Sequence, residues 1–277
     1  MSKTDQKSSW RLLTTPPSNG PWNMAVDEAI LEAVGRGESP PTLRLFAWEP
    51  PCLSIGYAQS IQVVDEEGVQ INGWDIVRRS TGGGAILHTD ELTYSVIGPA
   101  DEPRLKGDII ASYQRLSKAI LNALKNLGLP AESQPIEKPT PDIALDPVCF
   151  EAPSHYEITV LGKKLVGSAQ ARKKNSVLQH GTLPLQGDLT RITKALIYPD
   201  ETTRTKAAER LLSRATTVES VLGAIVSWEK AADIFAAAFS RELFLELKPG
   251  ELTEWEKVRA NELLGEKFEN KEWTRRA

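Results

Sequence analysis

The side chains best suited to covalent or acid–base chemistry are rare here, because the chain has only two cysteines and three histidines. A cysteine thiolate is a strong nucleophile, and its reactivity depends on how readily the thiol loses its proton. Cys52 lies inside an apolar run, which favours a buried and inert thiol. Cys149 follows a proline-rich stretch and precedes an expected strand, where a thiol can reach a substrate. On the residues alone, Cys149 is either inert or reactive.

A second candidate is the run Arg78-Arg79-Ser80-Thr81-Gly82-Gly83-Gly84-Ala85, at the end of an expected strand. Gly82, Gly83 and Gly84 have no Cβ atoms, so this backbone can approach a ligand closely and turn its N–H groups toward it. A glycine cluster in a β-hairpin or bulge is the alternative. The two arginines before the glycines and His88 after them favour the wall of a ligand site.

Two further expected strands carry candidate residues. In the run from Gly162 to Gln170, strand alternation places Lys164, Val166 and Ser168 on one face. A lysine that points into a site can stabilise a thiolate and an acyl oxyanion, although a solvated turn lysine is the commoner case. His180 stands beside Gly181 in another strand, where a histidine is more often a hydrogen-bonded structural group than a catalyst.

Composition excludes several classes of protein. The 277 residues are 40% hydrophobic and 25% charged with a formal charge of −4, which is typical of a globular chain rather than a disordered or fibrous one. Two cysteines cannot form a disulfide framework, and no Cys/His spacing suits structural zinc. Neither G-x-G-x-x-G after a strand nor G-x-x-x-x-G-K-[ST] occurs, so Rossmann and P-loop nucleotide sites have no support.

The polar N-terminal residues and the lack of a long apolar stretch predict a cytoplasmic location. Residues 1–9 are polar and lack the apolar core of a secretory signal, and no stretch has the roughly 18 apolar residues that span a bilayer. The cytosol keeps thiols reduced and available for chemistry. A sequence pI near 5.6 argues against general nucleic-acid binding.

Hydrophobic periodicity predicts short strands in the first two thirds of the chain and helices in the last third. The α+β class follows, rather than a regular βαβ series. Four prolines within residues 133–147 predict an extended surface loop. The first helix is expected to begin at Asn23 as N-cap and to end near residue 34. The other expected helices are 108–127, 189–197, 201–212, 218–222, 228–239 and 253–264; the expected strands are 10–13, 42–48, 52–57, 74–78, 85–87, 92–97, 155–160, 164–171, 176–185 and 244–247.

Taken together, these blocks resemble the lipoate/octanoate-protein transferase and ligase family. The double arginine, glycine-rich turn and histidine of that family match Arg78 to His88, its Lys-x-x-Gly-Ser-Ala signature matches Lys164 to Ala169, and its His-Gly-Thr/Ser strand matches His180 to Thr182. The resemblance implies a biotin/lipoate protein ligase-like domain of mixed, largely antiparallel sheets with packed helices. That catalytic domain is expected at residues 10–240, with a mostly helical C-terminal extension at 241–277.

Two sequence details indicate which branch of this family the chain resembles most. ATP-using ligases continue the histidine as His-Asp-x-Gly-Asn and lack a cysteine at the position of Cys149, whereas His88 is followed here by Thr-Asp-Glu. The run from Cys149 to Glu157 is similar to that of octanoyltransferases which load the glycine cleavage H protein. Lipoyl amidotransferases also carry the cysteine, but without Phe-Glu-Ala-Pro after it and without three intact glycines in the turn.

The resemblance implies an octanoyl-[acyl carrier protein]:protein N-octanoyltransferase that uses no ATP, metal or other cofactor. Cys149 would take the octanoyl group from octanoyl-acyl carrier protein as a thioester, and a lysine of a lipoyl-domain protein such as glycine cleavage H protein would then form the amide. Lys164 would lower the pKa of the Cys149 thiol and hold the acyl oxygen. The residues expected to bind substrate or shape the acyl tunnel are Arg78, Gly82, Gly83, Gly84, His88, Gly167, Ser168, Ala169 and His180.

We expect a monomer that contacts neither nucleic acid nor membrane, with the basic cluster 172–174 as the docking face for the acidic carrier protein. Three other functions stay open. The chain could be an ATP-dependent lipoate-protein ligase, an amidotransferase that moves lipoyl or octanoyl groups between lipoyl domains, or a non-catalytic acyl-binding protein on the same fold.

Overall fold

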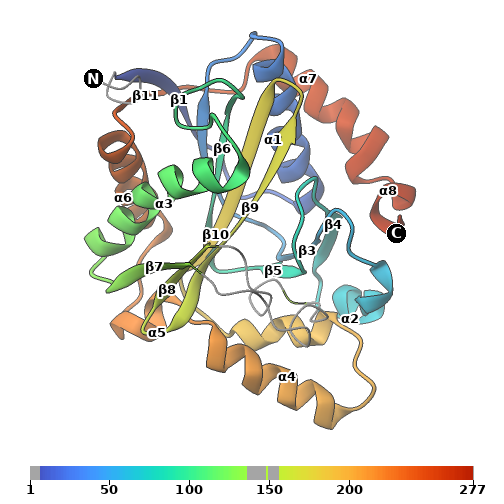
Figure 1. The fold of residues 1–277 in the computed structure, drawn as a ribbon. Helices are drawn as coiled ribbons and strands as arrows, with labels where there is room; N and C mark the ends of the chain where they lie inside the picture. Colours follow the sequence, from blue (N-terminus) through green and yellow to red (C-terminus); the bar gives the residue numbers. More distant parts are fainter. Residues whose placement is uncertain (1–6, 136–147, 149–155, 277) are drawn as a thin grey trace.

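A mixed sheet of eight strands runs through the molecule (Figure 1). The computed structural model describes residues 7–135, 148 and 156–276. The strand order is β11-β1-β2-β6-β10-β9-β8-β7, and β1 is parallel to both of its neighbours while the other ladders are antiparallel. The strands are β1 (Ser8–Thr14), β2 (Thr42–Phe46), β6 (Glu91–Pro99), β7 (Ala131–Pro135), β8 (Tyr156–Val160), β9 (Lys163–Lys173), β10 (Ser176–Pro184) and β11 (Leu245–Pro249).

A second sheet of three strands carries the glycine-rich turn. In the order β4-β3-β5, β3 (Cys52–Ile55) is parallel to β4 (Asp75–Arg78) and antiparallel to β5 (Ile86–His88). Residues 79–85 therefore cross the end of β3 on their way from β4 to β5. The backbone N–H of Tyr57 donates to the carbonyl of Thr81 at 2.8 Å and holds this crossing in place.

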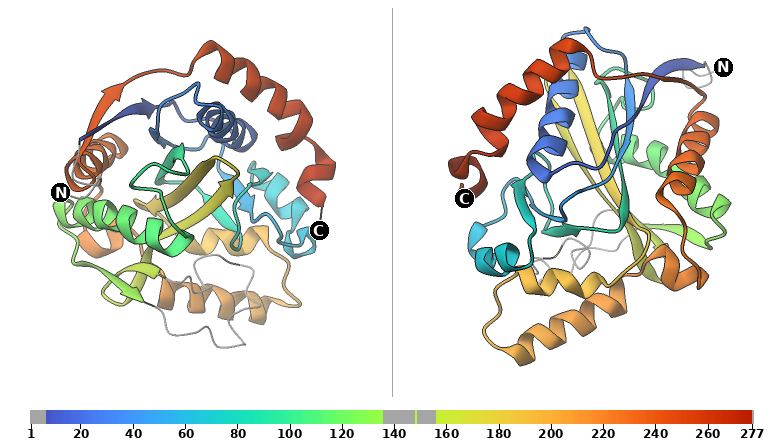
Figure 2. Two further views of the ribbon diagram at one scale, coloured as in Figure 1. Left: turned by 45° about the horizontal axis from the view of Figure 1, so that its top comes forward. Right: turned by 180° about the vertical axis from the view of Figure 1, so that it is seen from behind.

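Helices cover both faces of the large sheet, as Figures 1 and 2 show. α1 (Gly20–Gly35) packs against β6 and β10, and α7 (Glu254–Leu263) packs on α1. α3 (Ile109–Asn126) and α6 (Trp228–Glu242) pack on each other over the opposite face. Strand β6 contributes side chains to the apolar clusters on both faces of the sheet. Tyr94 and Val96 lie in the cluster under α3 and α6, and Ile97 lies in the cluster under α1.

The remaining helices are short or lie at the rim of the small sheet. η4, a 3₁₀ helix at Leu189–Ala195, and α4 contribute to a third apolar cluster beside β3 and β5. No helix of the described chain is both long enough and apolar enough to cross a bilayer. The other bounds are α2 (Glu66–Ile71), α4 (Glu201–Arg214), α5 (Val218–Leu222), α8 (Lys271–Arg275), a 3₁₀ turn at Ile61–Val63 and a π-helical turn at Leu264–Phe268.

The α+β class is confirmed, but the expected start of the first helix is wrong. α1 begins at Gly20 because the Asn19 side chain accepts a hydrogen bond from the N–H of Trp22 at 2.8 Å. Asn23 lies inside the helix and is fully buried. Its amide donates to the carbonyls of Ser18 and Ala47, so it ties the helix to the chain beside it.

Three other expectations differ from the structure. Residues 133–135, expected as the beginning of a loop, end strand β7 and pair with β8. The rest of that loop, 136–147, lies outside the described residues. Residues 189–195 form a 3₁₀ helix rather than an α-helix. Helix α2 was not expected, and Asp65 caps it by accepting from the N–H of Gly68.

The segment after residue 240 is packed into the rest of the molecule, while its status as a separate extension stays a prediction. β11 lengthens the large sheet beside β1. The Arg11 guanidinium donates two hydrogen bonds to the Glu256 carboxylate, at 2.7 and 2.6 Å, and the Glu256 side chain is fully buried. These contacts hold α7 against β1.

Candidate active site

A cavity between the two sheets brings together several of the expected site residues. Its empty space is about 380 Å³, the open solvent at its mouth included. Its wall is mainly apolar. The lining residues are Met24, Trp48, Ser54, Arg79, Ile86, His88, Thr93, Gly167, Ser168, Ala169, His180, Gly181 and Thr182.

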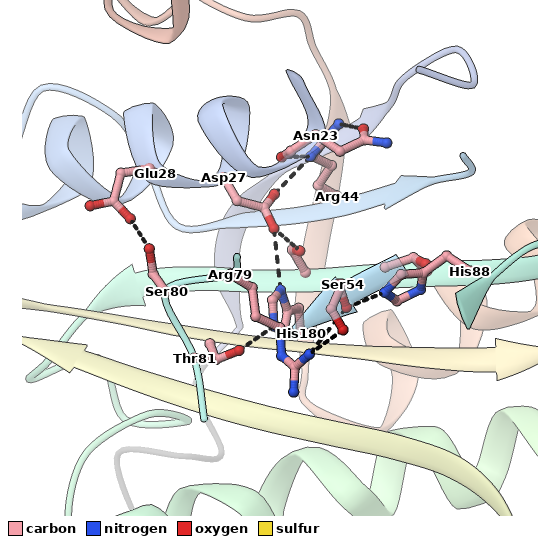
Figure 3. A network of polar contacts seen from close by, with 12 residues as sticks. Asn23, Asp27, Glu28, Arg44, Ser54, Arg79, Ser80, Thr81, His88 and His180 are labelled. Carbon is pink, nitrogen blue, oxygen red and sulfur yellow. Dashed lines mark hydrogen bonds and ion pairs between the residues drawn. The ribbon is translucent and has the colours of Figure 1, made fainter. Parts of the chain in front are cut away.

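His88 joins the cavity to a buried carboxylate. Its Nδ1 lies 2.6 Å from Glu91 Oε1. Its Nε2 lies 2.8 Å from the Ser54 hydroxyl (Figure 3). Trp48 stacks on the imidazole with ring centroids 4.0 Å apart. Burial works to raise the pKa of the Glu91 carboxyl, but His88 and hydroxyl donors outweigh it and hold that pKa below its ordinary value. Residue His88 is therefore fixed in orientation by a carboxylate, a hydroxyl and an aromatic face.

His180 has a similar arrangement on the other side of the cavity. Its Nε2 lies 2.7 Å from the Thr81 hydroxyl, and its Nδ1 lies 3.6 Å from Asp27 Oδ2. Asp27 also accepts from Arg44 at 2.8 Å and from the Ser95 hydroxyl at 2.6 Å (Figure 3). Burial lowers the pKa of His180. Burial opposes ionisation of Asp27 as well, yet Arg44 and His180 keep its pKa below the ordinary value.

Arg79 holds the glycine-rich turn against the cavity. One guanidinium nitrogen donates to the carbonyls of Gly82 and Gly84, at 2.8 and 2.7 Å, and another donates to the carbonyl and hydroxyl of Ser54, both at 3.1 Å. Gly83 has a φ of +96°, which disfavours a side chain. A Cβ on Gly56 would lie 1.9 Å from the Gly83 carbonyl oxygen, so the turn also packs tightly on the end of β3.

Gly82 differs from its neighbours. It is exposed, its φ lies outside the left-handed region, and a Cβ built on it meets no atom within 4 Å. Nothing in the described chain therefore requires a glycine at this position. Gly82, Gly83 and Gly84 are not among the residues that line the cavity.

Arg78 points away from the cavity. Its guanidinium donates to the carbonyls of Gly56 and Gln59, each at 2.7 Å, and to the carbonyl of Thr274 at 2.8 Å. The indole N–H of Trp273 returns a bond to the Arg78 carbonyl at 2.9 Å. Arg78 thus fastens the C-terminal helix α8 to the loop after β3, while the next residue, Arg79, faces the cavity.

Lys164 lies three residues before the Gly167–Ala169 wall on the same strand. Its side chain is 4% exposed, and its Nζ lies 3.0 Å from Glu157 Oε1 on β8. A register shift between β8 and β9 pairs Thr159 with Lys164 and Ile158 with Val166, so the strict alternation expected over 164–168 is interrupted.

Cys149 and His155 lie outside the described residues. The residue before Cys149, Val148, is buried and forms an isolated parallel bridge with Ala85 at the end of the glycine-rich turn. Val148 also lines a neighbouring cavity of about 460 Å³ that shares Ile86 with the first one. Cys52 is fully buried, and burial raises the pKa of its thiol well above the ordinary value, which suits an inert side chain.

Two residues of the expected docking cluster have partners within the chain. Arg172 donates to the carbonyls of Leu105 and Asp108 at the start of α3. Lys173 pairs with the buried carboxylate of Glu28. Charges committed to such contacts are less available for a carrier protein.

Sequence reasoning missed Asp27, Ser54 and Glu91 as parts of the site. One signal was present, because acidic residues inside apolar helices and strands need a partner when they are buried. Within the described residues, no group of three or more histidine, cysteine, aspartate and glutamate side chains is placed to hold a metal ion.

Comparisons with known proteins bear on this site. The model of the lipoyl protein ligase A/B catalytic domain matches residues 19–240, most of the chain. The chain belongs to this family. The family predicted from the motifs is therefore confirmed, and the match contains both histidine networks, the glycine-rich turn and Lys164.

Curated relatives in the family extend over nearly the whole chain. Octanoyltransferase LipM of Moorella thermoacetica is 43% identical over 97% of this chain and 98% of its own, and that of Symbiobacterium thermophilum is 41% identical over 98% and 99%. Octanoyltransferase LipM of Staphylococcus aureus is 36% identical over 96% and 98%.

Solved structures of the family confirm the fold. A bipartite lipoate protein ligase from Thermoplasma acidophilum superposes with a TM-score of 0.79 at 28% identity, covering 98% of this chain and 96% of that one. A lipoate-protein ligase A bound with ATP gives a TM-score of 0.77 at 28% identity, covering 98% and 99%. The fold is thus similar to that of enzymes named as ligases, so fold alone does not distinguish ligation from transfer.

Proposed function

We propose that this chain is an octanoyltransferase of protein lipoylation. It takes an octanoyl group from octanoyl-acyl carrier protein, holds it as a thioester on Cys149 and passes it to a lysine of a lipoyl domain, with glycine cleavage H protein as the expected acceptor. It acts as a monomer in the cytoplasm and needs no cofactor.

The observation that carries this proposal is the mainly apolar cavity, whose walls come from the same motifs that the sequence singled out. Gly167 and Ala169 have little or no side chain, which leaves space for an acyl chain beside β9. Each buried methylene contributes roughly 0.8 kcal/mol to binding. The curated relatives, named octanoyltransferases, support an eight-carbon acyl group as the occupant.

The chemistry proceeds in two balanced steps. The Cys149 thiolate attacks the thioester carbonyl, a new C–S bond forms, and the bond to the carrier's sulfur breaks; the departing thiolate then takes a proton. The acceptor ammonium loses one proton and its amine attacks the acyl-Cys149 carbonyl. As the C–N bond forms, the C–S bond breaks, the nitrogen loses a second proton, and the Cys149 thiolate is regenerated.

Each part of the described site has a role in these steps. Lys164 places a cation where it favours the thiolate and the developing acyl oxyanion. The His88 and His180 networks, together with Arg79, keep the glycine-rich turn and the strand wall at a fixed separation around the chain. Arg78 fixes the loop after β3, and that loop begins at Gly56, on which the turn packs.

The ligase alternative has one observation in its favour, the TM-scores to lipoate protein ligases. Transfer from a thioester needs no nucleotide because the acyl group is already activated, whereas ligation of a free acid needs ATP. The ATP requirement therefore separates the two functions.

The test is intact-mass analysis of the purified chain mixed with octanoyl-acyl carrier protein without ATP. A mass increase of one octanoyl group is expected on the wild type and not on Cys149→Ala, and it disappears when apo-H protein is added. Modification that persists in Cys149→Ala overturns the thioester. A product that forms only from free lipoate or octanoate with ATP supports the ligase, and a preference for octanoyl-H protein as donor supports the amidotransferase.

A further inference from the structure

The ion pair between Lys164 and Glu157 joins β9, three residues before the cavity wall begins, to β8, and neither the motifs nor the family match explains its role. Lys164 Nζ and Glu157 Oε1 are 3.0 Å apart, and the two side chains are 4% and 17% exposed. An ammonium at this level of burial is unfavourable unless an opposite charge or acceptors compensate it. Water screens the contact poorly, so it is stronger than an ion pair on an open surface.

The β8–β9 hairpin brings these two residues together. Leu161 and Gly162 at its tip have φ values of 51° and 77°, which suit a tight two-residue turn. Thr159 of β8 pairs with Lys164 of β9. Glu157 is two residues before Thr159 on β8, so its side chain is on the same face of that strand as Thr159. A diagonal neighbour at this spacing is within reach of a long side chain.

The backbone of Lys164 is held from a second direction. Its carbonyl accepts from the N–H of Thr216 at 3.1 Å, and it forms an isolated parallel bridge with Ala215. The lysine side chain, by contrast, has four rotatable bonds, and it loses considerable rotamer freedom when its ammonium is fixed. Glu157 anchors that end, while Gly167 begins the cavity wall three residues further along β9.

We propose that Glu157 is a positioning residue that holds the Lys164 ammonium at the edge of the acyl cavity. This inference rests on the proposed function for its kinetic consequence, but not for the ion pair itself. An ammonium has three N–H donors, so it can bind a carboxylate and an acyl oxygen together. Glu157 acts through Lys164, and it contacts neither the acyl group nor the acceptor.

A double-mutant cycle tests the coupling. The variants are Glu157→Gln, which keeps the shape and removes the charge, Lys164→Ala, and the double variant. The rate of acyl-enzyme formation is measured from the mass shift in single turnovers, with the KM for octanoyl carrier protein measured in parallel. We expect Glu157→Gln to slow acylation about tenfold with KM changed less than about twofold, since an interaction made in the transition state affects kcat. In the Lys164→Ala background the same substitution should change the rate less than about twofold.

Two further variants separate positioning from general support of the hairpin. Glu157→Asp keeps the charge on a shorter side chain and should recover part of the lost rate. Glu132→Gln is the matched control, because Glu132 is an exposed glutamate on β7, the next strand of the same sheet. Glu132→Gln should leave the acylation rate unchanged both in the wild-type chain and in the Lys164→Ala variant.

The proposal is overturned if Glu157→Gln slows acylation equally with and without Lys164, or if it leaves the rate unchanged. If the wild type takes up no octanoyl group, the proposed function fails, and the cycle is read instead from urea unfolding. Coupling between positions 157 and 164 in the free energy of unfolding then supports the anchoring of Lys164, while additivity overturns it.

Discussion

Two consecutive arginines beside the glycine-rich turn hold different parts of the molecule. On the cavity side, Arg79 binds the Gly82 and Gly84 carbonyls and connects to the His88 network through Ser54. On the outer side, Arg78 binds the loop after β3 and the carbonyl of Thr274. The inner contacts shape the space for a ligand, and the outer contacts join distant parts of the chain. Loss of the inner contacts should therefore impair activity more, and loss of the outer ones should mainly reduce stability.

Arg79→Met should have the largest effect on activity. It removes the donors for two carbonyls of the turn and for Ser54, and a displacement of about 1 Å at a site can cost about 100-fold in rate. We expect octanoyl transfer to fall by about that factor, with a loss of roughly 2–4 kcal/mol in the free energy of unfolding. Steady-state transfer assays and urea titration measure the two quantities.

Arg79→Lys is the control for that substitution. It keeps the charge but lacks the planar fork that reaches both carbonyls at once, so its activity should be intermediate. A fully active Arg79→Met would show that the turn keeps its shape without this side chain.

Arg78→Met should reduce stability clearly while it reduces transfer activity only modestly. The loop carbonyls and the end of the chain lose a charged donor, so we expect the free energy of unfolding to fall by roughly 2–4 kcal/mol. Transfer by the folded protein should fall less than about tenfold, because the cavity wall does not include this side chain. If transfer by Arg78→Met fell as far as in Arg79→Met, the distinction between the two arginines would not hold.

The difference between the two arginines also shows what could be predicted from sequence. The motif placed both beside a ligand site, but consecutive residues of an extended chain point to opposite sides, and a motif does not say which one faces inward. Gly167, Ser168 and Ala169 line the cavity, and the sequence singled them out because they stand together in one short signature on one strand; that they bind substrate stays a prediction. Asp27 and Glu91 were missed because their partners are distant in sequence or come from other elements, as with Asp27 and Arg44.

The inner networks should also give stability a dependence on pH. Burial lowers the pKa of His180, so the unfolded chain takes up a proton near the ordinary value of about 6.5 while the folded chain resists it. The free energy of unfolding should therefore decrease as pH falls from 7 to 5. Asp27, whose pKa is also lowered, adds stability that is present above its unfolded value of about 4 and is lost only at lower pH.

His180→Asn provides the comparison for this dependence. His88 is present in both proteins, so the difference between their pH profiles isolates residue 180. Urea titrations at pH 7, 6 and 5 should give a flatter profile for the variant. Equal slopes would mean that His180 is not the group that resists protonation.

Within the turn itself, Gly82 and Gly83 allow the finest comparison. Gly83→Ala forces a side chain into a backbone conformation at φ +96° and should cost about 1–2 kcal/mol of stability. Gly82→Ala meets open space and should change stability by less than about 0.5 kcal/mol. If a substrate passes close to this backbone, Gly82→Ala should still raise the KM for octanoyl carrier protein several-fold, because the new methyl group occupies the space that the substrate needs. A Gly82→Ala variant with unchanged stability and unchanged KM would show that substrate does not approach the turn there, and would leave Gly83 as the glycine that the fold itself requires.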